Sequence, residues 1–142
     1  MSDDRWRRTR GSVTRLRLPV VFVAWTLLVW ATRIDNIVGA DDLSGWGRAA
    51  RLALAGSFLV LGVAATVGIG RAGARWLVPL LRVLAAWTIA VWGVRAIQIG
   101  LGDHAVGFVI VHTALAVISI GLALAVLRSR PAPVPDDAVP TG

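Results

Sequence analysis

Two arginines that recur at matched positions inside apolar segments are the residues best suited to bind a ligand. Arg33 and Arg95 each follow the pattern A-W-T-x-x-V-W by three positions, which the chain carries at residues 24–30 and again at 86–92. An arginine near the centre of a membrane span costs roughly 2.5 to 3.5 kcal/mol and by default suggests a function. Its planar fork of donors fits phosphate and carboxylate groups. These residues therefore predict a site for a lipid headgroup or a small organic anion.

Further repeated side chains lie on the same helical face as each arginine. At 100° per residue, the repeated positions of the first copy fall within an arc of about 140°. Tryptophan rings on this face would supply cation–π contacts or an apolar wall. Alternatively, both arginines extend to the outer headgroups, with Trp30 and Trp92 covering their aliphatic stems. The predicted ligand-binding residues are Arg33, Arg95, Trp30, Trp92, Trp25, Trp87, Asn36, Gln98 and His112.

The two histidines, His104 and His112, share one helical stripe with Phe108. Eight residues at 1.5 Å each separate the two imidazoles by about 12 Å, so they cannot bind one metal ion or both faces of one haem. We expect His112 to form an interhelical hydrogen bond, for example with Gln98 or a tryptophan face, and we predict no metal and no cofactor. The alternatives are a haem held by His112 alone and an outer metal site formed by Asp41, Asp42, Asp103 and His104.

No catalytic residue is predicted. The chain has 15 arginines but no lysine, 8 aspartates but no glutamate, and no cysteine. The lack of cysteine removes thiol catalysis, disulfides and thiolate metal sites. The sequence also contains no G-x-S-x-G, no H-E-x-x-H and no glycine-rich phosphate loop. We therefore expect a protein that is not an enzyme.

Four apolar segments must position these side chains. A hydrophobic content of 56% and a mean hydropathy of +0.72 exclude most soluble classes. A bilayer core of roughly 30 Å needs about 20 mostly apolar residues in a helix. Residues 19–39, 52–70, 77–101 and 105–127 each reach this length. The predicted class is an all-α, polytopic membrane protein with four transmembrane helices in a domain of residues 18–130.

The repeat extends beyond the arginine motif. At the same offset of 62 residues, Asn36 matches Gln98 in the first and third spans, and Ser57 matches Ser119 in the second and fourth. We interpret the chain as two tandem two-helix units. Because each unit has an even number of spans, both enter the membrane with the same polarity. The units are thus expected to be parallel repeats related by a pseudo-two-fold axis along the membrane normal.

The flanking arginines predict the orientation. Ten arginines lie before the first span, between the second and third, and after the fourth, which predicts that both termini are cytoplasmic. The Arg-, Ala-, Gly- and Val-rich composition indicates a GC-rich genome, and hence the plasma membrane of a bacterium, its inner membrane. Residues 1–17 form a basic flank that either lies on the anionic leaflet or is disordered. Residues 131–142 are rich in proline and are expected to form a disordered tail.

The predicted function is binding or transport of an anionic lipid or small organic anion near the outer leaflet. One alternative is a non-catalytic accessory or structural subunit that docks another membrane protein or a second copy of this chain. Another is a haem or quinone redox subunit. The net charge of +7 comes mainly from arginines that flank the spans. We therefore expect membrane lipids as partners and no nucleic acid.

Overall fold

The structure is built from helices. The computed structural model describes residues 3–39, 45–71 and 74–129. Within these ranges it forms the helices α1 (Asp3–Val38), α2 (Gly45–Gly70), α3 (Leu77–Leu101) and α4 (Val106–Arg128). Each helix contains a stretch that is long and apolar enough to cross a membrane. The expected all-α class with four candidate spans is therefore confirmed.

Helix α2 begins earlier than the apolar segment 52–70 predicts. It starts at Gly45 and carries Arg51 inside the helix. Hydropathy alone ends the segment at the charged residues, whereas Ala49, Ala50 and Arg51 are good helix formers that let the helix continue. Arg51 therefore lies within α2, six residues after its first residue, and its side chain is exposed.

Helix α1 is longer than its apolar core. It runs from Asp3 through Pro19 to Val38, so the backbone of the basic flank is helical from Asp3 onward. The part of α1 that is apolar enough to span a membrane begins at Arg17. The proline-rich tail expected at residues 131–142 lies outside the described residues.

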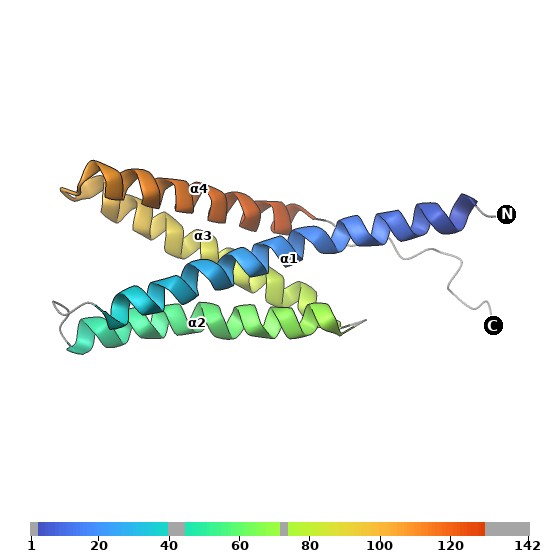
Figure 1. Ribbon diagram of the computed structural model, residues 1–142, viewed down its shortest axis with the longest axis horizontal. Coiled ribbons are helices and arrows are strands. Elements are labelled where there is room, and N and C mark those ends of the chain that lie inside the picture. Colours follow the sequence, from blue (N-terminus) through green and yellow to red (C-terminus); the bar gives the residue numbers. More distant parts are fainter. Residues whose placement is uncertain (1–2, 40–44, 72–73, 130–142) are drawn as a thin grey trace.

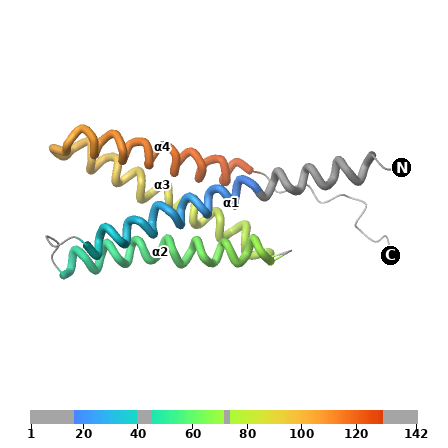
Figure 2. Tube along the Cα trace, in the orientation of Figure 1, coloured from blue at the N-terminus to red at the C-terminus, as the bar shows by residue number. Residues whose placement is uncertain are grey.

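The helices alternate in direction and pack in two pairs. α1 packs most extensively on α2, and α3 on α4, while α1 also contacts α4 and α2 contacts α3. α1 and α3 therefore lie diagonally across the bundle, as Figure 1 shows. α1 ends, and α2 begins, at the end of the bundle that also carries the connection between α3 and α4 (Figure 2). Side chains near this end can thus come together from all four helices.

The buried faces of α1 and α3 correspond position by position. Each buried residue of the apolar part of α1 has a buried counterpart 62 residues later in α3. The five pairs are Phe22 and Leu84, Val23 and Ala85, Thr26 and Thr88, Trp30 and Trp92, and Ile37 and Ile99. Both threonine hydroxyls donate to the carbonyl oxygen four residues earlier, in each case at 2.8 Å. The two helices therefore present the same set of side chains to the core.

Two tryptophan–serine hydrogen bonds join the helix pairs. The indole Nε1 of Trp25 in α1 donates to the Oγ of Ser119 in α4 at 3.0 Å. The Nε1 of Trp87 in α3 donates to the Oγ of Ser57 in α2 at 3.1 Å. Both donors and both acceptors are 62 residues apart. The bonds tie α1 to α4 and α3 to α2 in the same way, and both indole N–H groups gain an acceptor in the bundle.

Gly62 sets the distance between α1 and α2. A Cβ atom at this position would lie 2.7 Å from the Cδ2 atom of Leu27 in α1, whereas a Cβ at Gly56 of the same helix would have no neighbour within 4 Å. Helices in lipid associate mainly through close packing, which small residues allow. The contact between α1 and α2 therefore depends on the missing side chain at Gly62.

We predict that Gly62→Val destabilises the bundle and that Gly56→Val does not. Valine at position 62 must displace Leu27, and overpacking of this kind costs about 1 to 3 kcal/mol. Both variants change helix propensity equally, so Gly56→Val is a matched control. Thermal unfolding of the purified proteins in detergent measures the difference. Equal unfolding midpoints for the two variants would contradict the prediction.

Candidate functional site

A small pocket lies between α1, α2 and α3. Its volume is about 40 Å³, enough for about three waters or the charged part of a larger ligand. Residues from all three helices line it: Trp30, Arg33, Ile37, Arg51, Leu54, Val91, Trp92 and Arg95. The repeated residues Arg33, Trp30, Arg95 and Trp92 thus meet at one place. We call it the arginine pocket.

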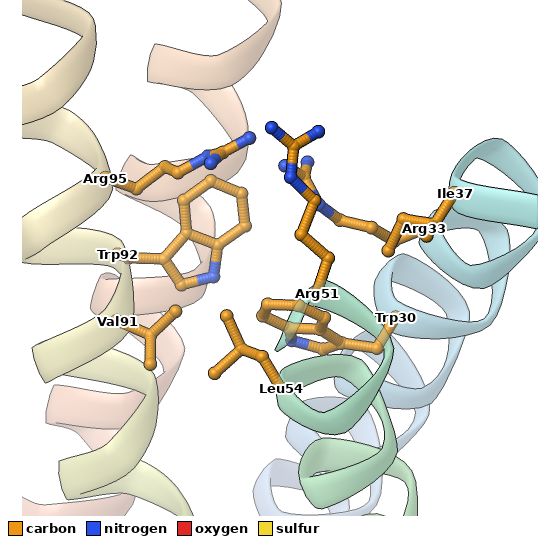
Figure 3. A pocket seen from close by; sticks show the side chains of 8 residues that line it. All are labelled: Trp30, Arg33, Ile37, Arg51, Leu54, Val91, Trp92 and Arg95. Atoms are coloured by element: carbon orange, nitrogen blue, oxygen red, sulfur yellow. The ribbon is translucent and has the colours of Figure 1, made fainter. Parts of the chain in front are cut away.

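Three guanidinium groups converge at one end of the arginine pocket. Arg33, Arg51 and Arg95 come from three different helices and point toward one another (Figure 3). Each lies about one and a half turns, roughly 8 to 9 Å, inside the end of its helix. Within the part of the chain that the structure describes, none of the three forms an ion pair with a carboxylate. The pocket therefore gathers positive charge that these residues leave uncompensated.

Aromatic and aliphatic side chains form the rest of the arginine pocket. Trp30 and Trp92 are almost fully buried, and Trp30 stacks on Phe58 with ring centroids 4.1 Å apart and planes 7° apart. These rings lie with Leu54 and Val91 on the side away from the guanidinium groups (Figure 3). Such walls hold little water, so charge–charge interactions in the pocket are stronger than at an exposed surface. The pocket thus combines a cationic end with a rigid apolar base.

Arg95 has a donor without an acceptor. Its Nε atom is buried and has no hydrogen-bond partner among the described residues. Leaving a buried donor unsatisfied costs about 1 to 3 kcal/mol, and more for a charged group. An anionic oxygen between the guanidinium groups would offer acceptors to this end of the pocket. The unsatisfied Nε donor of Arg95 therefore favours an anion in the arginine pocket, as the convergence of positive charge does.

Arg33 faces His112 of α4. Its Nη1 atom lies 3.5 Å from Nε2 of His112, whose Nδ1 lies 2.9 Å from the carbonyl oxygen of Phe108. A carbonyl only accepts and a guanidinium only donates, so Nδ1 is the donor to the carbonyl of Phe108 and Nε2 faces the donor of Arg33. The expected interhelical contact of His112 is thus made with Arg33, on the tryptophan-bearing face of α1, and not with Gln98.

An aromatic stack holds the imidazole of His112. The ring centroid of Phe108 lies 3.8 Å from that of His112 and 4.9 Å from that of His104. The two ring nitrogens of His112 lie near Arg33 and near the carbonyl oxygen of Phe108. Among the described residues, no three histidine or acidic side chains are grouped to hold a metal ion. Asp41 and Asp42, part of the alternative metal site, lie outside the described residues.

The remaining predicted site residues do not line the arginine pocket. Trp25 and Trp87 are held by serines of neighbouring helices, as described above. Asn36 is exposed at the periphery, and Gln98 is exposed beside Arg51 and Arg95 in a separate hollow. The shared helical face thus divides into a buried part, which reaches the pocket, and an exposed part, which does not.

The sequence analysis missed the role of Arg51. A signal for it was present in the spacing of α2, because the buried residues Ala55, Phe58, Gly62 and Ala65 alternate at steps of three and four. One further step of four back from Ala55 reaches Arg51, which extends the same stripe. Arg51 was left out of the site because hydropathy began the second predicted span at residue 52, directly after this charged residue. The helical spacing of the buried residues, which includes position 51, was not used.

Similarity to known proteins does not identify this pocket. No protein-family model, no curated protein and no solved structure matches the chain. What the pocket binds is therefore inferred from what lines it, namely three guanidinium groups, two indole rings and three aliphatic side chains.

Proposed function

We propose that this chain is an integral membrane protein whose arginine pocket binds the anionic group, a phosphate or a carboxylate, of a lipid or small organic molecule. The observation that carries the proposal is the convergence of Arg33, Arg51 and Arg95, from three helices, on one pocket without a carboxylate among the described residues. Binding or transport of this ligand is its function, and catalysis is not required of it.

Electrostatics favours an anion in the pocket. Two like charges 4 Å apart repel by about 4 kcal/mol at the effective dielectric of a protein near its surface. Arg33, Arg51 and Arg95 come from three helices and point toward one another, so they repel in the same sense. An oxyanion between them converts the repulsion into charge-assisted hydrogen bonds, which are the stronger kind and are often bidentate for arginine. Phosphate and carboxylate groups match this geometry.

The membrane orientation follows from charge and aromatic position. Ten arginines flank the spans on the side that carries both termini, which makes that side cytoplasmic. Trp46 and Trp76, at the starts of α2 and α3, are exposed, as is usual for tryptophans at the headgroup level. In this orientation the arginine pocket lies toward the outer leaflet of the plasma membrane of a bacterium.

The two helix pairs are tandem repeats related by a pseudo-two-fold axis. The matched buried faces of α1 and α3 support this relation, as do the reciprocal tryptophan–serine bonds. Under such an axis the contact of α1 with α4 is equivalent to that of α3 with α2, and both are present. Arg33 and Arg95 then reach the pocket from opposite sides because they occupy equivalent positions.

We predict that Arg33→Gln, Arg51→Gln and Arg95→Gln each weaken binding of a phosphate-headed lipid about 10- to 150-fold. Each removes a charge-assisted hydrogen bond, which contributes about 1.5 to 3 kcal/mol. Native mass spectrometry with added phosphatidic acid measures the bound lipid. Arg82→Gln is the matched control, because Arg82 is an exposed arginine of α3 away from the pocket. Unchanged lipid binding in all three variants would refute the proposed site.

A second prediction concerns the sign of the stability change. Without an anion, Arg51→Gln raises the unfolding midpoint, because it removes repulsion from the pocket. With inorganic phosphate added, the wild-type midpoint rises by the linkage of binding to folding, and the rise is smaller in Arg51→Gln. Thermal unfolding with and without phosphate measures both effects. The double variant Asp41→Asn, Asp42→Asn tests whether the acidic residues before α2 serve as internal anions, and it should leave the phosphate effect unchanged.

The orientation can be tested with single cysteines, because the chain has none of its own. We predict that Asp103→Cys, between α3 and α4, reacts with a membrane-impermeant maleimide in intact cells. Ser129→Cys, after α4, should react only after the cells are permeabilised. The reverse pattern would place the arginine pocket toward the cytoplasm and contradict the proposed orientation.

A further inference from the structure

A hollow on the surface of α2 and α3 adjoins the arginine pocket. It has a volume of about 380 Å³, within the range of sites that hold small molecules. Arg51, Leu54, Val91 and Arg95 line both this hollow and the arginine pocket. Two of the three guanidinium-bearing side chains are therefore reachable from the outside of the bundle between α2 and α3.

A second hollow continues along the same two helices. It has a volume of about 490 Å³ and shares Trp87 and Ala90 with the first. Its remaining lining residues are Ser57, Leu61, Val83 and Ala86, so its walls are mainly apolar. We call the two hollows together the α2–α3 groove. The groove has cationic side chains at one end and an apolar surface at the other.

The dimensions of the α2–α3 groove suit a hydrocarbon chain. The stretch of α3 from Val83 to Gln98, which lines the groove, rises about 22 Å at 1.5 Å per residue. One leaflet contributes half of a bilayer core of roughly 30 Å, or about 15 Å. The groove is thus long enough to hold a chain over the full depth of one leaflet. Trp87 forms a fixed flat surface where the hollows meet, because its indole is bonded to Ser57.

We infer that the ligand is a lipid with a phosphate or carboxylate head in the arginine pocket and a hydrocarbon chain in the α2–α3 groove. This inference rests on the proposed function and specifies the ligand class. Charge complementarity fixes the head at Arg51 and Arg95, which belong to both pocket and groove. The pocket alone, at about 40 Å³, holds only the charged group. The rest of the ligand must therefore extend from the pocket into the groove, past the residues that line both.

The opposite side of the bundle lacks the cationic entrance. The position 62 residues after Arg51 is Thr113 in α4, and the guanidinium of Arg33 faces His112 there. A third hollow of about 500 Å³ runs between α3 and α4, lined by Trp92, His112 and aliphatic side chains but by no arginine. The polar lining residues of that hollow are His112 and Thr113, and it has no pair of guanidinium groups like Arg51 and Arg95. The protein therefore binds one lipid chain, on the side of α2 and α3.

Filling each groove separately tests the placement of the chain. Ala90→Phe fills the α2–α3 groove, and Ala96→Phe fills the hollow between α3 and α4; both alanines are exposed residues of α3. The probes are dodecyl phosphate and inorganic phosphate, titrated into the protein in phosphatidylcholine nanodiscs. We expect Ala90→Phe to weaken dodecyl phosphate about tenfold and to leave inorganic phosphate unchanged, while Ala96→Phe changes neither.

The outcomes separate the two proposals. If Ala90→Phe weakens both probes equally, or if Ala96→Phe is the variant that selectively weakens dodecyl phosphate, the chain does not lie in the α2–α3 groove. If wild-type protein binds neither probe, the proposed function itself fails. Photolabelling of the wild type with a diazirine in the chain of a phosphate-headed lipid gives an independent readout. Labels on α2 and α3 near Leu61 and Val83 support the inference, and labels confined to α4 overturn it.

Discussion

Mutual repulsion of Arg33, Arg51 and Arg95 is the constraint on which the site depends. Each guanidinium is carried by a different helix, so the groups approach only when the bundle is closed. Arg33 and Arg95 are half-buried and Arg51 is exposed, so this approach costs free energy that solvent screens only in part. Apolar packing must therefore hold the helices together against the charges. An anion bound as proposed would remove this repulsion.

The packing that opposes the repulsion lies directly beneath the pocket. Trp30 stacks on Phe58 with centroids 4.1 Å apart, and Phe58 lies 6.1 Å from Trp87. Aromatic pairs contribute about 0.5 to 1.5 kcal/mol beyond the area they bury. Because Trp30 is held from α2, the α1 backbone that carries Arg33 cannot turn freely toward the periphery. Packing thus restricts the route by which the arginine would reach outer headgroups, and directs it toward Arg51 and Arg95.

Part of this site could be predicted from the sequence. The repeated motif predicted that Arg33, Arg95, Trp30 and Trp92 share a role, and the structure brings all four to one pocket. Arg51 was missed because it does not recur in the second unit, so a repeat cannot point to it. The sequence placed the partner of His112 on a tryptophan-bearing face or at Gln98, but it did not single out Arg33. The contact between α1 and α4 depends on which helix faces pack together, and the sequence alone does not distinguish among the many apolar faces.

The departures from the repeat explain more of the proposed function than the repeat does. A repeated pair of arginines places two cations symmetrically about an axis, and that symmetry alone would give two equivalent openings. α2 and α4 break it, since the buried positions of α4 are Ala116, Ser119, Ala123 and Val126, which correspond to residues 54, 57, 61 and 64 rather than to the buried positions of α2. Of α2 and α4, only α2 supplies an arginine to the pocket. If the two helix pairs are repeats, as proposed, the one unrepeated charge of Arg51 favours a single, one-sided site over a symmetric pair.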